Sequence, residues 1–237
     1  MNYNWNWAIF FQPAPDGTGA YWWWLVTGIG WTLATALSAW VIALTLGSII
    51  GTLRTTPNPW VVRLGNAYVE LFRNIPLLVQ IFLWYHVIPQ IFRTLQGVPD
   101  FIAVVIALGF FTSARIAEQV KAGIQALPKG QRYAGLAMGL TLPQTYRYVI
   151  LPMAFRIVIP PLTSESMNII KNSSVAFAVS ISELTFFAMQ AQEETSRGIE
   201  IYLAVTFLYF ISAFAVNRVA AFIEKRVQVP GMIGSKR

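Results

Sequence analysis

The chain has 237 residues, of which 56% are hydrophobic and only 11% are charged, and it carries 17 Lys and Arg against 10 Asp and Glu. An ordinary soluble domain is about 45–50% apolar and about 25% charged, so this composition indicates an integral membrane protein. The absence of Cys and the single His exclude disulfide frameworks, thiol catalysis and clustered metal sites. A nucleotide-binding motif and a catalytic constellation are also missing from the sequence. We therefore expect a non-catalytic chain with no metal and no cofactor of its own.

The first membrane span is predicted within residues 27–53. Over residues 17–53 the only ionisable side chain is that of Tyr21, and this stretch exceeds the roughly 20 residues that a helix needs to cross a bilayer. Tyr21 and the three tryptophans that follow it are typical of an aromatic anchor at the membrane interface. Gly47 and Gly51 form a GxxxG pattern, which allows another helix to approach closely.

Four further spans are predicted, at residues 66–90, 101–118, 157–182 and 201–223. The third becomes long enough only if it continues past Arg115, a charged residue that either reaches toward the interface or lines an internal path. The predicted fold class is therefore all-α: a polytopic inner-membrane protein with five spans in one transmembrane domain, residues 1–237.

The distribution of positive charge predicts the orientation of these spans. Segments 54–73, 115–156 and 218–237 fall on one side of the membrane and hold 14 of the 17 Lys and Arg residues. Cytoplasmic loops are enriched in these residues, so the N-terminus is expected outside and the C-terminus inside. The net charge of +7 is thus a topology signal, and we expect no nucleic acid partner.

The fourth predicted span carries a stripe of polar side chains. At about 100° per residue, five of them share one helix face: Ser164, Glu165, Asn168, Lys171 and Asn172. Ionisable groups at membrane depth usually face a bundle interior or a water-filled path. We therefore interpret the stripe, together with Arg115, as the lining of a path for a small charged substrate. The alternative is a structural seam, in which Glu165 and Lys171 neutralise one another or neighbouring groups between helices.

Residues 126–156 are predicted to form a cytoplasmic loop with a short helix at about Tyr133–Met138. Gly139 follows this helix, and the Leu142-Pro143 pair is expected to act as a stop. The helix would expose apolar side chains among cations, which is typical of a docking surface. The alternative is a helix that lies against the membrane helices of its own chain.

The same loop resembles the EAA signature of permease subunits of bacterial ABC importers. That signature has an EAA triplet, three residues, a glycine, nine residues and then Ile-x-Leu-Pro. Here Gly139 is followed by nine residues and Val149-Ile150-Leu151-Pro152, whereas Tyr133-Ala134-Gly135 stands in place of the usual triplet. The resemblance implies coupling to an ATPase, and Pro152 is expected to end the connection rather than continue a helix. The expected coupling residues are Tyr133, Ala134, Gly135, Leu136, Met138, Gly139, Leu151 and Pro152.

Two further stretches narrow the family. Residues 70–80 (ELFRNIPLLVQ) are similar to the ELFRGTPLLVQ segment of polar amino acid permeases, and residues 160–174 follow the same subfamily. Over nearly the whole chain the sequence resembles permeases of glutamate/aspartate importers, within the histidine/glutamate/arginine-type permease family. This resemblance implies the type I importer fold, the bacterial inner membrane and alternating access. It also implies a sister permease in a heterodimer, a dimer of ATPase subunits that binds ATP and Mg, and a periplasmic amino-acid-binding protein.

Two alternatives stay open on the residues alone. Lys171 and Arg115 suit an acidic amino acid, but Glu165 on the same stripe suits a cationic one, so an importer of basic or other polar amino acids is the first alternative. The second is an ATP-independent secondary transporter or channel, in which Glu165 would couple transport to a proton or another ion. Only an importer predicts stable co-purification with an ATP-binding subunit.

Overall fold

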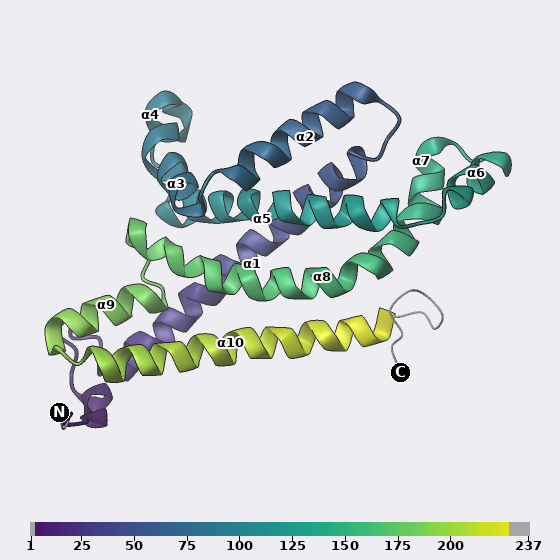
Figure 1. Ribbon diagram of the computed structural model, residues 1–237. Helices are drawn as coiled ribbons and strands as arrows, with labels where there is room; N and C mark the ends of the chain where they lie inside the picture. Colours follow the sequence, from purple (N-terminus) through teal and green to yellow (C-terminus); the bar gives the residue numbers. More distant parts are fainter. Residues whose placement is uncertain (1–2, 228–237) are drawn as a thin grey trace. The chain divides into compact units, whose positions relative to one another are not determined.

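The computed structural model describes residues 3–227, and most of them are helical (Figure 1). Within this range the structure contains no strand, only an isolated bridge between Pro13 and Ala20. The predicted cationic segment 218–237 extends further, so its part from residue 228 onward lies outside the described residues. The prediction of an all-α membrane protein is confirmed.

Three of the described helices are long and apolar enough to cross a membrane: α1 (Tyr21–Leu53), α5 (Asp100–Gln125) and α10 (Gly198–Val227). α1 begins at the predicted aromatic anchor, and α5 continues past Arg115 as expected. Two more spans arise when helices on either side of a short break are counted together, which gives up to five.

The predicted span 66–90 is not one uninterrupted helix. α2 (Pro59–Asn74) ends before Ile75, whose backbone is extended with φ −90° and ψ 128°, and α3 (Leu77–Phe82) begins after Pro76. The residue before a proline is driven out of the helical region, and proline has no N–H for the helix. The chain then continues as the π-helical turn η2 (Leu83–Val87), α4 (Ile88–Ile91) and the 3₁₀ turn η3 (Arg93–Leu95).

The helix in the region of the fourth predicted span, 157–182, begins several residues before the expected start. α8 covers Leu151–Asn172, with Pro160 and Pro161 inside it, and the 3₁₀ turn η5 (Ser173–Val179) follows. Before α8 come α6 (Lys129–Ala137), α7 (Leu142–Thr145) and the π-helical turn η4 (Tyr146–Ile150). α9 (Leu184–Thr195) completes the series before α10.

The Leu142-Pro143 pair begins a helix, so the predicted stop was wrong. Thr141 is the N-cap of α7, and its backbone N–H donates to Oε1 of Gln144 at 2.8 Å. Proline is well accommodated in the first turn of a helix, because its missing N–H has no partner to lose there. Thr141 and Gln144 have the spacing of a capping box, which is a start signal that the sequence already contained.

The described residues form two compact units. One comprises residues 3–41, 76–109 and 168–215, and the other comprises 42–75, 110–167 and 216–227. The boundaries fall within α1, α5, α8 and α10 and at the break between α2 and α3.

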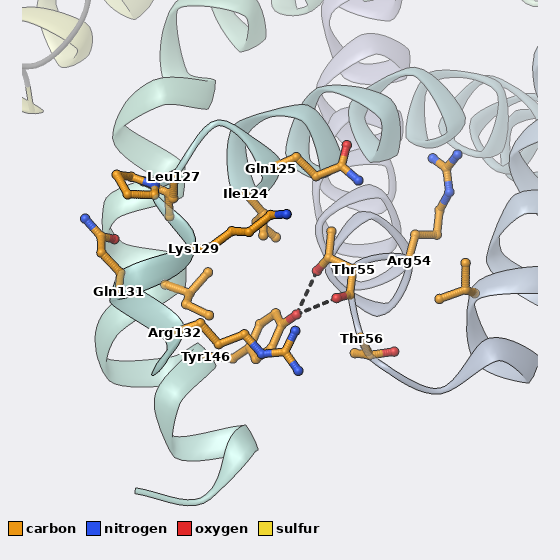
Figure 2. Close-up of a pocket in the computed structure, with 13 residues that line it drawn as sticks. Arg54, Thr55, Thr56, Ile124, Gln125, Leu127, Lys129, Gln131, Arg132 and Tyr146 are labelled. Carbon is orange, nitrogen blue, oxygen red and sulfur yellow. Dashed lines mark hydrogen bonds between the residues drawn. The ribbon is translucent and has the colours of Figure 1, made fainter. Parts of the chain in front are cut away.

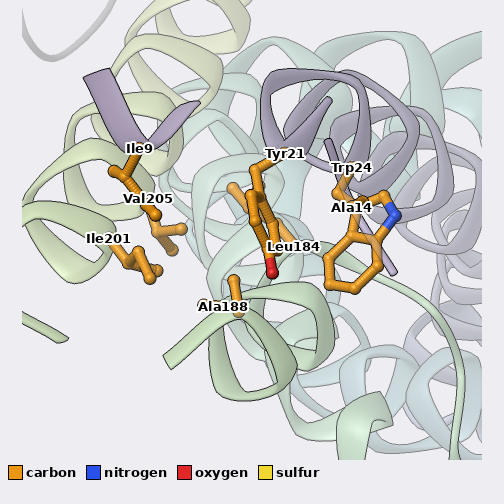
Figure 3. Close-up of a cluster of buried hydrophobic side chains, with 9 residues drawn as sticks. Ile9, Ala14, Tyr21, Trp24, Leu184, Ala188, Ile201 and Val205 are labelled. Carbon is orange, nitrogen blue, oxygen red and sulfur yellow. The ribbon is translucent and has the colours of Figure 1, made fainter. Parts of the chain in front are cut away.

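The first unit holds the N-terminal segment on α9 and α10 (Figure 3). The 3₁₀ turn η1 (Trp7–Phe11) contributes one side chain to a buried cluster of Ile9, Tyr21, Trp24, Leu184, Ile201 and Val205. The carboxylate of Glu200, which is fully buried, accepts hydrogen bonds from the backbone N–H of Asn6 at 2.8 Å and from the hydroxyl of Tyr3. A buried carboxylate satisfied in this way fastens the segment to the start of α10.

In the second unit, α1 and α5 approach closely along the GxxxG pattern. A Cβ at Gly47 would lie 2.7 Å from Cβ of Ile116, and one at Gly51 would lie 2.7 Å from Cβ of Val120. Only glycine leaves room for this contact, so the expectation of close helix approach is confirmed. The contact fixes the ends of α1 and α5 that border the loop between α5 and α8.

Candidate functional site

The loop helix α6 ends in a well-defined cap. The backbone N–H of Gly139 donates to the carbonyl of Leu136 at 3.0 Å, and that of Leu140 donates to the carbonyl of Gly135 at 3.2 Å. Gly139 has φ +85°, and this combination is the Schellman motif, which terminates a helix at a left-handed residue. At its other end α6 begins at Lys129, four residues before the predicted start. Met138 is the C-cap residue.

An apolar face of α6 is open to solvent. Tyr133 is 66% exposed, Met138 82% and Leu136 38%, and Ala134 and Gly139 are exposed as well. Large apolar side chains in this position are typical of a docking surface. The exposure favours docking over packing against the chain's own helices, and the coupling role of these residues stays a prediction.

Gly135 has a different environment from the rest of the predicted coupling residues, because it is buried against α7. A Cβ at this position would lie 2.7 Å from Cγ2 of Thr145. The glycine that replaces the last alanine of the usual triplet therefore lets α6 and α7 pack together, which gives this departure from the EAA signature a local physical reason.

Leu151 and Pro152 lie on a third element, the first turn of α8. The backbone N–H of Leu151 donates to the carbonyl of Tyr146, five residues back, which makes η4 a π-helical turn. In a regular helix the ring of Pro152 would collide with the carbonyl four residues back, and the wider turn avoids this. The helix therefore continues through Pro152, and the expectation that Pro152 would end the connection was wrong.

A cleft of about 570 Å³ lies between α6, η4 and the ends of α1 and α5 (Figure 2). Tyr146 closes one side of it: its hydroxyl donates to the carbonyl of Thr55 at 2.7 Å and lies 3.1 Å from the Thr55 hydroxyl. These bonds tie the π turn that follows α7 to the residues directly after α1.

Arg54 links three helices at the same end of the second unit. Its Nε donates to Asn66 of α2 and its Nη2 to Glu118 of α5, both at 2.8 Å, and the residue is only 6% exposed. Arg73 of α2 lies 3.6 Å from the same oxygen of Glu118. In the sequence alone, Arg54 is only one of the cations that indicate the topology. Its partner Glu118 is 64 residues away along the chain, so no local pattern revealed this link.

Two of the predicted path residues form a bidentate ion pair. Nε and Nη2 of Arg115 lie 2.9 Å and 3.0 Å from the two carboxylate oxygens of Glu165, and Gln119 donates to the same carboxylate at 3.3 Å. Arg115 thus neutralises Glu165 between α5 and α8, which is the kind of contact that the structural seam describes.

The rest of the predicted stripe is divided between the two units. Ser164 is exposed and belongs to the second unit, whereas Asn168, Lys171 and Asn172 belong to the first. Lys171 is exposed, and its side chain forms no ion pair within the described residues. A common path for these residues stays a prediction from helical spacing.

The fold and the loop define a class of protein: a polytopic helical membrane protein whose loop between two spans carries an exposed apolar helix. Residues 43–229 match the family described as the binding-protein-dependent transport system inner membrane component. The chain belongs to this family. The family resemblance seen in the sequence is thereby confirmed.

Individual relatives extend the match to the whole chain. The chain is 43% identical to the glutamate/aspartate import permease protein GltJ of Escherichia coli (strain K12), over the full length of both. It is 36% identical to the probable glutamine ABC transporter permease protein GlnM of Bacillus subtilis (strain 168), over 83% of this chain and 90% of that one. It is 26% identical to the glutamate/aspartate import permease protein GltK of Escherichia coli O6:H1, over 94% and 99%.

Solved structures agree with this placement. A crystal structure of an amino acid ABC transporter with histidines superposes with a TM-score of 0.76 and 30% identity, over 87% of this chain and 95% of that one. An inward-facing structure of the MetNI methionine ABC transporter superposes with a TM-score of 0.77 over 87% and 97%, at 24% identity, which shows the fold alone. The expected importer permease fold is confirmed.

Proposed function

We propose that the chain is the permease subunit of an ABC importer that moves glutamate and aspartate into the cytoplasm. The observation that carries the proposal is the 43% identity over the full length of a glutamate/aspartate import permease. The geometry of α6 supports it, because an exposed apolar helix with two defined ends suits contact with a separate subunit.

The proposed assembly contains a sister permease, two ATPase subunits that bind ATP and Mg, and a periplasmic amino-acid-binding protein. GltJ and GltK are both named glutamate/aspartate import permeases, and similarity to both supports pairing with a sister chain. The family description refers to binding-protein-dependent transport at the inner membrane. We place the N-terminus outside and the C-terminus in the cytoplasm, on the strength of the charge distribution.

In this assembly α6 transmits the closure of the ATPase dimer to the spans. Movement of α6 acts on α7 through the contact of Gly135 with Thr145. It reaches the end of α1 through the bonds of Tyr146 to Thr55. Arg54 then passes it to α2 and α5 through Asn66 and Glu118. The loop and three helices of the second unit therefore respond together, as alternating access requires.

The charges in the structure support an acidic substrate. A cationic substrate would need an anion such as Glu165, but Arg115 already neutralises this carboxylate. Lys171 is exposed, so it is the proposed cation for a substrate carboxylate.

The test is uptake of labelled glutamate into proteoliposomes that contain the chain, its co-purifying subunits and its binding protein. ATP is enclosed or withheld, and excess aspartate or arginine competes. We expect ATP-dependent uptake that aspartate blocks and arginine does not. Competition by arginine would instead indicate an importer of basic amino acids, and uptake indifferent to ATP would favour a secondary transporter. Lys171→Met should lower uptake without loss of co-purification. Lys171→Arg, the matched control, should retain uptake.

A further inference from the structure

The cleft behind α6 collects positive charge without an acidic counterpart. Lys129 and Arg132, both from the first turn of α6, line it, and Figure 2 shows both side chains directed toward the side where Thr55 and Tyr146 lie. No Asp or Glu is among the described residues that line this cleft. The cleft is thus suited to an anion rather than to a cation or a neutral group.

The position of these cations on α6 is unfavourable in the absence of a ligand. Cations are normally stabilised at the C-terminal end of a helix, where the helix dipole is negative. Lys129 is instead the first residue of α6, and its N-cap, Pro128, supplies no side-chain hydrogen bond. The start of α6 and the two cations therefore lie together at the cleft, and an anion would interact favourably with the positive end of the helix dipole and with both cations.

Buried polar atoms at the cleft also lack partners. Nε of Arg132 and Nη1 of Arg54 are inaccessible to solvent and have no hydrogen-bond partner within residues 3–227. Arg54 is only 6% exposed, although its other nitrogens are bonded. Buried donors of charged groups are rarely left unsatisfied, and both atoms belong to cations of the cleft lining.

The surroundings of the cleft identify the source of the anion. α2 contributes Val62 to the cleft wall and presents Trp60 and Leu64 to the outside, 69% and 72% exposed. An exposed Trp at the start of an amphipathic helix is typical of the headgroup level of a bilayer. Trp60 thus favours a position of the cleft at the level of the lipid phosphates, where basic pockets between membrane helices bind anionic headgroups.

We propose that this cleft binds the phosphate group of an anionic phospholipid through Lys129, Arg132 and the start of α6. The bound headgroup would bridge α6 and the end of α1, so lipid composition would set how firmly the loop helix is held. This inference is independent of the proposed substrate and partners, because it concerns only the chain and its bilayer.

The test compares two double variants that each remove two positive charges. Lys129→Gln/Arg132→Gln removes the cleft cations. Arg63→Gln/Arg147→Gln is the matched control, because Arg63 and Arg147 are exposed cations of the same unit that lie over Trp60 and Tyr148, outside the cleft. The full chain, with its co-purifying subunits, is placed in nanodiscs of mixed phosphatidylglycerol and phosphatidylcholine, and the lipid retained after detergent extraction is measured by native mass spectrometry.

Wild type and the control are expected to retain phosphatidylglycerol in preference to phosphatidylcholine. The cleft variant should retain about tenfold less, because it loses charge-assisted hydrogen bonds to the phosphate. Equal retention by the two double variants, or no preference in wild type, would overturn the proposal. A further measurement distinguishes free phosphate from lipid. If millimolar inorganic phosphate raises the thermal stability of the protein in pure phosphatidylcholine as much as phosphatidylglycerol does, the site belongs to free phosphate. Should the double variant not assemble, Lys129→Gln alone decides, because this exposed side chain at the start of α6 has no packing role.

Discussion

Arg115 and Glu165 neutralise each other, but their surroundings differ. The side chain of Glu165 is 6% exposed, whereas that of Arg115 is 42% exposed. Loss of the arginine leaves a buried carboxylate without its counter-ion, and loss of the carboxylate leaves a guanidinium that solvent can reach. The two residues therefore contribute unequally to stability, even though they share the same two contacts.

The first prediction follows from this asymmetry. Arg115→Gln should lower the free energy of unfolding by roughly 3 kcal/mol, because it strands a buried charge, whereas Glu165→Gln should cost about 1 kcal/mol after allowance for solvent screening. Thermal unfolding of the purified variants in detergent measures which of them loses more stability. The apolar double variant Arg115→Met/Glu165→Met should lose less than Arg115→Gln, because it removes both charges and leaves none stranded. A larger loss for Glu165→Gln than for Arg115→Gln would contradict this account.

A second prediction concerns the contact between α6 and α7. Gly135→Ala should destabilise the protein by about 1–3 kcal/mol, because the new Cβ would meet Cγ2 of Thr145 at 2.7 Å. Thr145→Ser removes that methyl group and should restore part of the loss. Gly130→Ala is the control on the same helix, since nothing lies within 4 Å of its added Cβ, and it should be neutral or slightly stabilising. Limited proteolysis at Lys129 and Arg132 measures how firmly α6 is held.

At the scale of the elements, prolines set the limit of prediction from sequence. The long apolar helices could be predicted because length and hydropathy alone define them. Pro76 separates two helices, with Ile75 extended, whereas Pro152 lies in a helix that continues through a π turn. The sequence around a proline does not decide between these outcomes, because the choice depends on whether nearby backbone groups find other partners.

The candidate site could be predicted from the sequence only where local patterns define it. The exposed face of α6 follows from its place in a charged loop and from the family spacing of Gly139. The hydrogen bonds that connect this region to the other helices could not be predicted in this way, since Tyr146 and Thr55 are 91 residues apart and Arg54 and Glu118 are 64 apart. A single sequence contains no signal for such pairs when neither residue belongs to a local pattern.

The third prediction tests the end of α6. Gly139→Asp should uncouple ATP hydrolysis from uptake in the proposed assembly, because a carboxylate would lie at the negative end of the α6 dipole and on its exposed face. Gly139→Asn is the matched control: Asn also tolerates a left-handed backbone but carries no charge, so it should keep more of the coupling. ATPase activity and uptake are measured on the same proteoliposomes. Normal uptake by Gly139→Asp would remove α6 from the coupling role.

At the scale of the whole molecule, the proposed orientation is open to a direct test, because the chain contains no cysteine. Gln12 and Lys225 are both exposed and lie before α1 and near the end of α10. With the N-terminus outside, a membrane-impermeant maleimide should label Gln12→Cys on intact cells and Lys225→Cys only after permeabilisation. The Cys-free parent is the control. The reverse pattern would invert the assignment of every loop.

The π turn η4 has a consequence for how this region can change in evolution. A turn closed five residues back holds one residue more than a regular turn, so it shifts the angular phase of everything after it by about 100°. The face that α7 presents and the face that α8 presents are therefore set separately. A one-residue deletion within Tyr146–Ile150 would convert the π turn to a regular turn and keep the phase of α8, but it would bring the ring of Pro152 against the carbonyl four residues back. The same deletion in the middle of α8 would instead rotate Glu165 away from Arg115.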